Sequence, residues 1–252
     1  MKLNKLLVSS LATLALSATL FADAHGTHWG YTGHESSKYW GDLSPEYGTC
    51  KKGKNQSPIN IVTSKVEHST ADDKLEFHYV TPGIEIINNG HTIQVNVEDG
   101  SSIKVDGEEF FLKQFHFHTL SENQINGKNF PLEIHFVHVS KKNHLAVVSV
   151  MFDKGLENPI IRKIWDKMPH TVEKGTLLYL DYEEINKLLP KNKDYYKFTG
   201  SLTTPPCSEN VKWMVMKNQI TVSGSETREF LHNMHHHNNR PIQDVNSRIV
   251  KD

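Results

Sequence analysis

The sequence has 252 residues, enough for one sizeable globular domain, and its 28 lysines and arginines nearly balance its 29 aspartates and glutamates. This balance excludes the basic footprint expected of a protein that binds nucleic acid or an anionic membrane surface. No internal repeat, low-complexity block or linker divides the chain. We therefore expect a single domain with no nucleic-acid partner.

The first 24 residues predict a cleaved export signal. A positively charged start precedes an apolar run over residues 6–21, and Ala22-Asp23-Ala24 has the small-x-small form of a signal-peptidase site. An uncleaved membrane anchor is the alternative, but the run is short for a spanning helix and polar residues follow it. We expect residues 25–252 to be exported without membrane insertion, to the periplasm or alternatively to the medium.

Export also bears on the two cysteines of the chain, Cys50 and Cys207. In an oxidising compartment they predict one disulfide, with free thiols or a metal-binding pair as the alternatives. A bridge across so long a loop would stabilise the fold by about 4–5 kcal/mol on the entropic description.

In chain order, residues 25–55 predict irregular structure held by Trp29, Tyr39 and Trp40, and a β-rich region follows. Turn signals such as Asn89-Gly90 separate extended apolar runs, as in antiparallel sheets. The predicted strands are residues 83–87, 92–97, 102–105, a strand through His116 and His118, and residues 132–139, 145–152, 177–180, 211–216 and 219–222.

Few helices are predicted. Asn158 and Pro159 fit the N-cap and first position of one helix, whose apolar residues repeat at helical spacing as far as Met168. Ser223 and Glu226 fit a capping box at the start of another. The chain is therefore predicted to be mainly β, with a few short peripheral helices.

The strongest chemical signal lies at Gln114-Phe115-His116-Phe117-His118. Alternate side chains of a strand share a face, so Gln114 and both histidines project together while both phenylalanines enter the core. An ordinary pair of surface histidines is the alternative, because the chain has 16 histidines. The aromatic surroundings argue against that alternative and favour half of a metal site.

His135 is the best candidate for a third ligand. Asn126-Gly127 could fold its strand back beside the first two histidines, with Glu133 on the same face and His138 on the opposite one. Three neutral imidazoles suit zinc and leave a fourth position for water. Gln114 and Glu133 are then placed to accept hydrogen bonds from the rings. Three consecutive histidines, His235-His236-His237, are a more conspicuous candidate for a metal site. On a helix their side chains would point in different directions, which predicts a solvated patch with adventitious metal binding at most.

Further motifs surround these residues in a fixed order. They are residues 29–31 (Trp-Gly-Tyr), 56–61 (Gln-Ser-Pro-Ile-Asn-Ile), 88–91 (Asn-Asn-Gly-His), 114–118, 132–138 and 200–206 (Gly-Ser-Leu-Thr-Thr-Pro-Pro). Together they make nearly the whole mature chain resemble an exported bacterial α-class carbonic anhydrase. The resemblance implies a single domain over residues 25–252, built around a large, mostly antiparallel twisted central β-sheet.

For function, the resemblance implies a zinc ion on His116, His118 and His135, and reversible hydration of carbon dioxide to bicarbonate and a proton by zinc-hydroxide attack. It also implies sulfonamide and anion inhibitors, with ester cleavage as a side activity. Thr203 would accept a hydrogen bond from the hydroxide while donating its own proton to Glu122, since a hydroxyl has only one proton to give.

His91 matches the proton shuttle of the family, and imidazole titrates in the useful range. Without the resemblance, His91 and Thr203 would be ordinary turn residues. The predicted substrate-binding residues are Thr203 and Thr204 with an apolar wall of Val137, Val147, Leu202, Val211 and Trp213.

Three positions depart from the family pattern: Leu120, Asn123 and Asn239, of which the first two could alter the support behind Glu122. A binding module without activity, a zinc-dependent esterase and a metal-storage protein are the competing functions. The retained ligand histidines with Glu122 and Thr203 argue against the first and the third. A homodimer is one of the assemblies that the sequence leaves open.

Overall fold

The computed structural model describes residues 27–69, 74–172 and 175–252. The predicted export signal therefore lies outside the described residues. Within them, no helix is both long enough and apolar enough to cross a membrane.

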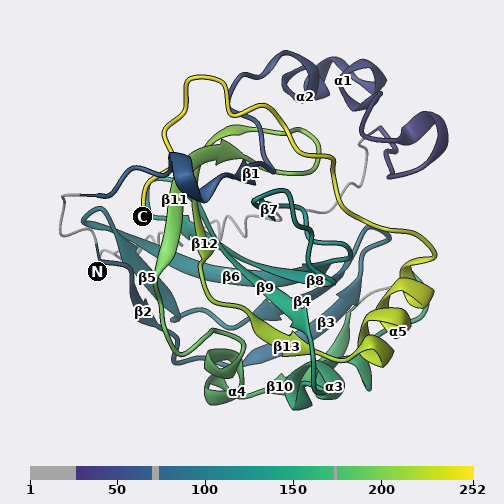
Figure 1. Ribbon diagram of the computed structural model, residues 1–252. Coiled ribbons are helices and arrows are strands. Elements are labelled where there is room, and N and C mark those ends of the chain that lie inside the picture. The colour runs from purple at the N-terminus through teal and green to yellow at the C-terminus, as the bar shows by residue number, and fades with distance from the viewer. Residues whose placement is uncertain (1–26, 70–73, 173–174) are drawn as a thin grey trace, which may run out of the picture.

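One large twisted sheet forms the body of the protein (Figure 1). Every strand pairing in it is antiparallel, except for β12 and β13, which each run parallel to β9. This confirms the predicted mainly β fold with a mostly antiparallel sheet. In spatial order the strands are β10 (Thr176–Leu180), β3 (Gly83–Asn88), β4 (Ile93–Val97), β6 (Glu108–His118), β8 (Leu132–Ser140), β9 (Leu145–Lys154), β12 (Glu209–Met216) and β11 (Tyr195–Ser201).

Five shorter strands complete the β-structure of the described residues. β5 (Ser102–Val105) pairs with β6 and with β2 (Glu76–His78), while β13 (Ile220–Val222) extends the sheet beside β9. β1 (Asn60–Ile61) and β7 (Gln124–Ile125) form a separate parallel pair, which ties the loop after β6 to the start of the sheet region.

Helices cover one face of the sheet, and the main hydrophobic core lies between them and that face. α3 (Pro159–Trp165) begins at Asn158, whose side chain accepts hydrogen bonds from the next backbone N–H groups, and α5 (Gly224–Met234) begins with the predicted capping box. α4 (Tyr182–Lys187) lies near them at the same end of the molecule (Figure 1). Because Phe117 of β6 packs edge-on against Trp165 of α3 at 4.7 Å, this strand is fixed with its phenylalanines toward the helices.

The opposite end carries short helices, where irregular structure was expected. Trp40 is fully buried and packs at 5.1 Å against the buried Trp29, as predicted, whereas Tyr39 is 37% exposed. The helices within residues 25–55 are the 3₁₀ turns η1 (Gly33–Glu35) and η2 (Pro45–Tyr47), with α1 (Trp40–Leu43) and α2 (Thr49–Lys52). A further 3₁₀ turn, η3 (Thr63–Lys65), follows β1.

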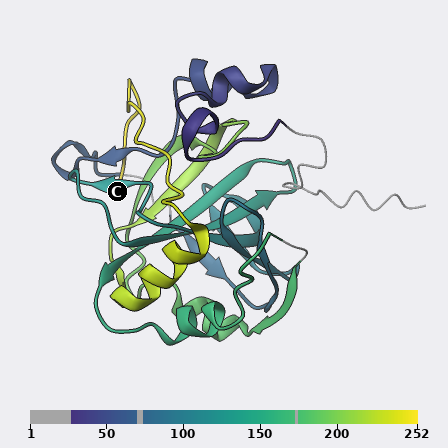
Figure 2. The same ribbon diagram turned by 90° about the vertical axis from the view of Figure 1, so that its right-hand side faces the viewer.

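After α5 the chain continues without helix or strand over residues 235–252, here called the C-terminal segment. It runs from α5 past the end that carries α1 and α2, and returns to β11, where Lys251 pairs with Lys197 (Figures 1 and 2). On this path Asn238 N donates to Thr119 O, next to the end of β6, and Gln243 N donates to Pro58 O, next to β1.

Candidate metal centre

Two neighbouring strands position the three histidines. His116 on β6 lies directly opposite His135 on β8, and His118 lies opposite Glu133. Side chains at paired positions of an antiparallel sheet share a face, so all four project from the face that the helices leave open. One nitrogen from each histidine lies within 4.8 Å of the others, and this is the only such cluster of three or more ligand-type residues in the described chain.

Each imidazole has one nitrogen held by a neighbour. His116 Nδ1 lies 2.8 Å from Gln114 Oε1, and His118 Nδ1 lies 2.8 Å from the backbone oxygen of Asn238. His135 Nε2 lies 2.9 Å from Glu133 Oε1, a contact that is short but poorly aligned for a hydrogen bond. The nitrogens left to face one another are therefore Nε2 of His116, Nε2 of His118 and Nδ1 of His135.

Burial makes this arrangement costly unless something binds there. His118 and His135 are each 1% exposed, and His118 Nε2 has no hydrogen-bond partner. Burial also lowers the pKa of His118, and it lowers the pKa of His116 well below its usual value, together with the neighbouring histidines. Neutral rings with inward lone pairs and an orphaned buried nitrogen fit a divalent metal ion, because metals take imidazole in its neutral form.

Glu133 is the anchor behind His135. It accepts hydrogen bonds at Oε2 from the backbone N–H groups of Glu122 and Asn123, at 2.6 and 3.0 Å, and at Oε1 from Asn123 Nδ2 and Ser149. Burial raises the pKa of Glu133, but the adjacent His135 ring and the side-chain donors Asn123 and Ser149 outweigh this effect and lower the pKa to about 2. This carboxylate stays ionised and holds the His135 ring in one orientation.

Glu122 is a second buried carboxyl group with the opposite tendency. Burial raises its pKa to about 7, although His135, the backbone N–H of Arg240 and the Thr203 hydroxyl each lower it. Its Oε1 accepts from Arg240 N at 2.8 Å, while Oε2 lacks an aligned partner and lies 3.6 Å from His118 Nε2. Glu122 and Thr203 are thus brought together beside the histidines, as the sequence predicts.

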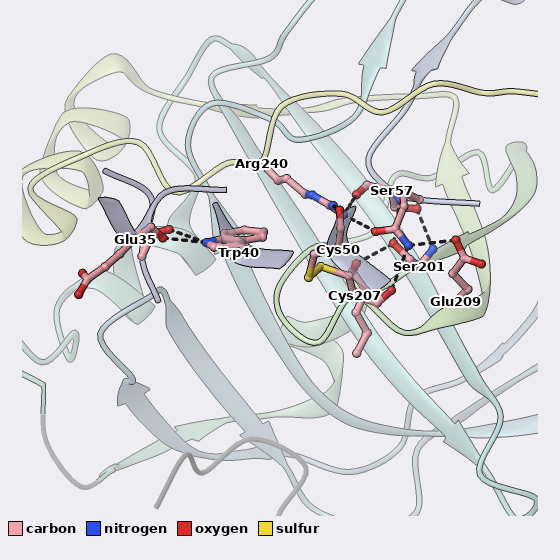
Figure 3. Close-up of a disulfide and its surroundings, with 11 residues drawn as sticks. Glu35, Trp40, Cys50, Ser57, Ser201, Cys207, Glu209 and Arg240 are labelled. Carbon is pink, nitrogen blue, oxygen red and sulfur yellow. Dashed lines mark hydrogen bonds between the residues drawn. A yellow bond between two sulfur atoms is a disulfide. The ribbon is translucent and has the colours of Figure 1, made fainter. Parts of the chain in front are cut away.

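The loop that carries Thr203 is tied to the N-terminal segment. Cys50 and Cys207 form the predicted disulfide, with Cα atoms 5.0 Å apart across 157 residues, and Cys207 N donates to Thr204 O at 2.8 Å. Figure 3 shows the Arg240 guanidinium beside the bridge, where it donates to Cys50 O at 3.0 Å and Ser57 O at 2.8 Å. The threonine loop is therefore held at its disulfide end.

A cavity of about 320 Å³ opens over the three histidines. Its lining includes an apolar wall of Val137, Val147, Leu202 and Trp213, which suits a small apolar molecule. Val211, also predicted for this wall, lies behind it in the buried cluster and does not line the cavity. The polar residues of the lining include His91, Gln94, Gln114, Thr203 and Thr204.

At the cavity mouth the His91 ring stacks on Trp29, with ring centres 3.7 Å apart and planes 7° from parallel. Asn89 closes the turn beneath it, since its Oδ1 accepts from the backbone N–H groups of His91 and Thr92, each at 2.9 Å. This polar turn fixes the backbone of the predicted shuttle histidine.

Comparison with known proteins agrees with this geometry. Residues 35–252 match the family described as eukaryotic-type carbonic anhydrase. The chain belongs to that carbonic anhydrase family. A carbonic anhydrase of Klebsiella pneumoniae is 46% identical over 244 residues, covering 95% of this chain and 96% of that protein. One from Neisseria gonorrhoeae is 44% identical over 246 residues, covering 95% and 94%.

A solved structure is similar as well. The α-carbonic anhydrase from Thermovibrio ammonificans, in complex with the inhibitor sulfanilamide, superposes with a TM-score of 0.86 at 44% identity and covers 90% of this chain and all of that one. The whole described sheet and the cavity over it therefore belong to the carbonic anhydrase fold, and the protein is an enzyme of that family.

The departures from the carbonic anhydrase pattern can now be located. Asn123 is fully buried and supports Glu133 through its side-chain N–H, while its Oδ1 accepts from Ile59 N at 3.1 Å. Leu120 is 39% exposed and makes no such contact. Asn123 therefore supports the Glu133 carboxylate from a buried position next to Glu122.

The consecutive histidines do not lie on a helix, contrary to the interpretation from sequence. α5 ends at Met234 and His235 takes the left-handed conformation, with φ of 63°. His236 Nδ1 and His237 Nδ1 lie 3.0 Å from the backbone oxygens of His237 and Thr119. These residues take no part in the three-histidine cluster.

Three supporting residues escaped sequence analysis. Ser149 on β9 reaches Glu133, and Asn238 and Arg240 in the C-terminal segment reach His118 and Glu122. For Ser149 the signal was available, because it is the one polar residue within the apolar run over residues 145–152, and it pairs with His135. The other two lie in a segment without periodicity, so no pattern pointed to them.

Proposed function

We propose that this protein catalyses the reversible hydration of carbon dioxide to bicarbonate and a proton, with a zinc ion held by His116, His118 and His135. One observation carries the proposal: one nitrogen of each ring lies 2.8 or 2.9 Å from an oxygen of a neighbour, and the other three nitrogens converge beneath a partly apolar cavity. Three imidazoles with an open fourth position are the ligand set of catalytic zinc sites, carbonic anhydrase being the standard example.

Zinc, when bound, would supply Lewis acidity that makes a hydroxide nucleophile available near neutral pH. The residues of the chain do the rest. Gln114 and Glu133 hold two of the ligand rings in the tautomer that turns a lone pair inward. The cavity wall of Val137, Val147, Leu202 and Trp213 offers carbon dioxide an apolar surface without competing hydrogen bonds.

Thr203 would orient the nucleophile. If its hydroxyl donates to the Glu122 carboxylate, it presents only lone pairs to the cavity and accepts from a group that carries a proton. The contact of Thr203 with Glu122 supports this role. His91 at the cavity mouth would receive the proton that hydration releases and pass it to buffer.

A direct test compares carbon dioxide hydration by the zinc-loaded protein, the chelated protein and the variant His118→Ala. We expect zinc-dependent hydration that the chelator abolishes and zinc restores, and little activity in the variant. His144→Ala serves as the matched control, because His144 lies on the surface beside Glu108. Full hydration by chelated protein or by His118→Ala would refute the proposal.

Inhibition gives a second test. The related Thermovibrio protein was solved with the inhibitor sulfanilamide, which supports binding of a sulfonamide by this protein. Its binding in this cavity, and inhibition by small anions, stay predictions. We expect sulfanilamide to inhibit hydration competitively with anions and to lose affinity in Thr203→Val, which keeps the shape but removes the hydroxyl. A flat inhibition curve would contradict this expectation.

Ester cleavage as a side activity, export of residues 25–252 and a homodimer stay predictions. The disulfide between Cys50 and Cys207 supports export, because such bridges persist in oxidising compartments. The mass of the protein recovered from cell fractions tests cleavage after Ala24 and the periplasmic location. Sedimentation tests the dimer, and hydrolysis of a nitrophenyl ester tests the side activity.

A further inference from the structure

Asn238 in the C-terminal segment holds together two parts of the candidate site, the turn that carries His91 and the end of β6. Its side chain is fully buried. Nδ2 donates to the backbone oxygen of His91 at 3.1 Å and to that of Phe117 at 2.9 Å, and Oδ1 accepts from Thr119 N at 2.9 Å. The turn that carries His91 and the end of β6 that carries His118 therefore meet at one carboxamide.

The backbone of Asn238 adds two contacts on the β6 side. Its N–H donates to Thr119 O at 3.1 Å, and its oxygen faces His118 Nδ1 at 2.8 Å. A carboxamide has two N–H donors and one carbonyl acceptor, and here all of them are used. An ionised aspartate in the same place could not donate a hydrogen bond to the backbone oxygen of His91 or of Phe117. The two carbonyl groups therefore require an amide side chain here.

A second bond ties the same turn to the same strand. The hydroxyl of Thr92, next to His91, donates to Phe117 O at 2.6 Å and accepts from Phe117 N at 3.2 Å. The turn is closed internally by Asn89, as described above, so it behaves as a short rigid unit. Thr92 fixes one end of that unit to β6, and Asn238 fixes the carbonyl of His91 itself.

We propose that Asn238 is a positioning residue that sets the distance between the proton-accepting His91 and the ligand His118. This inference rests on the proposed function. The rate of proton transfer depends steeply on the distance between the donor and the acceptor. A residue that accepts the proton therefore speeds the reaction only while it is held at the right distance. Loss of the hydrogen bonds made by the Asn238 carboxamide should therefore slow removal of the proton more than it slows hydration.

The test uses Asn238→Asp in the zinc-loaded protein. Product forms before the proton leaves, so kcat/KM reports hydration and kcat reports proton removal. We expect kcat to fall about tenfold and kcat/KM by less than about threefold, with imidazole buffer restoring kcat because it replaces the displaced His91. The matched control is Asn186→Asp, since Asn186 Nδ2 donates to two carbonyls at 3.1 and 2.9 Å, on α4 away from the cavity. It should leave both constants unchanged.

A double-mutant cycle separates positioning from general damage. In a His91→Ala background, Asn238→Asp should change kcat by less than about twofold, because no shuttle remains to be displaced. Independently of activity, the zinc dissociation constant, measured by competition with a chromogenic chelator, should rise about tenfold. The side-chain bonds of Asn238 hold in place its backbone oxygen, which faces His118 Nδ1, and loss of support for a ligand histidine typically costs at least this much.

Equal losses in kcat and kcat/KM, without imidazole rescue and with an equal loss in the His91→Ala background, would overturn the inference. If Asn238→Asp does not fold, Asn238→Ser provides the same comparison with a smaller polar side chain. Failure of the proposed function looks different, because the unmodified protein itself would then show no zinc-dependent hydration.

Discussion

The backbone N–H of Arg240 donates a hydrogen bond of 2.8 Å to Glu122 Oε1, across 118 residues of sequence. The guanidinium of the same residue donates to Gln56 Oε1, Ser57 O and Cys50 O. Arg240 is only 2% exposed. One residue therefore links the carboxylate beside the histidines to the disulfide and to the motif that starts the sheet region.

Replacing Arg240 by methionine should destabilise the protein strongly. The change leaves three buried acceptors without their donor and removes the cation that attracts Glu122. Breaking such a buried charged network typically costs about 3–5 kcal/mol of unfolding free energy, which denaturant titration measures. Arg162→Met is the matched control, because Arg162 makes a bidentate pair with Glu229 on the surface and should lose about 1 kcal/mol or less. Equal losses in both variants would contradict the expectation.

Glu133→Gln should weaken metal binding. The carboxylate accepts from four donors, and an amide in its place must turn one N–H toward another donor. Removing a carboxylate behind a ligand histidine typically raises the metal dissociation constant about 10–100-fold. Competition with a chelator measures it, and Glu229→Gln, on the surface, should leave it unchanged. Unaltered zinc affinity would show that Glu133 does not control His135.

Reduction of the Cys50–Cys207 bridge should lower both stability and activity. The bridge closes a loop of 157 residues, worth about 5 kcal/mol on the entropic description. Activity should fall because Cys207 N holds Thr204 O in the loop that carries Thr203. Melting curves and hydration rates before and after reduction measure the two effects. If neither changed, the bridge would have no role in holding the threonine loop.

Much of the sheet could be predicted because its signals are local. Asn-Gly and Asp-Gly turns and alternating apolar residues predicted the strands around His116, His118 and His135, and the pairing of His116 with His135 follows from that fold-back. β11 was missed. Only Phe198, Gly200 and Ser201 of its seven residues are buried, so it lacks the regular apolar alternation of an inner strand.

The supporting contacts could not be predicted for a different reason. Asn238 and Arg240 reach residues more than 100 positions away, and they lie in a segment that has neither helix nor strand. Nothing in local periodicity says where such a segment runs, because its course is set by hydrogen bonds to other parts of the fold. The same limit explains why the consecutive histidines were assigned to a helix that ends one residue before them.

His138, which is not part of the metal site, should make the stability of the folded protein sensitive to acid. It lies on the helix-covered face of β8, where Nε2 faces the Tyr79 hydroxyl at 2.8 Å, and burial lowers its pKa to about 3. The unfolded chain takes up a proton near pH 6.5 and the folded one only near pH 3. Stability from the neutral ring is therefore complete above the pKa of the unfolded chain and is lost as the pH falls toward that of the folded protein.

The matched variant is His138→Gln, whose amide can accept from Tyr79 and does not titrate. At pH 8 we expect the free energy of unfolding of the variant to be no higher than that of the unmodified protein. Between pH 8 and pH 4 we expect the variant to gain about 3 kcal/mol relative to the unmodified protein, because each tenfold difference in proton affinity between the folded and unfolded states corresponds to about 1.4 kcal/mol. Denaturant titrations of both metal-free proteins across this range measure the difference, in which the acid effects common to both cancel. A difference that does not change with pH would mean that His138 is protonated in the folded state as readily as in the unfolded chain.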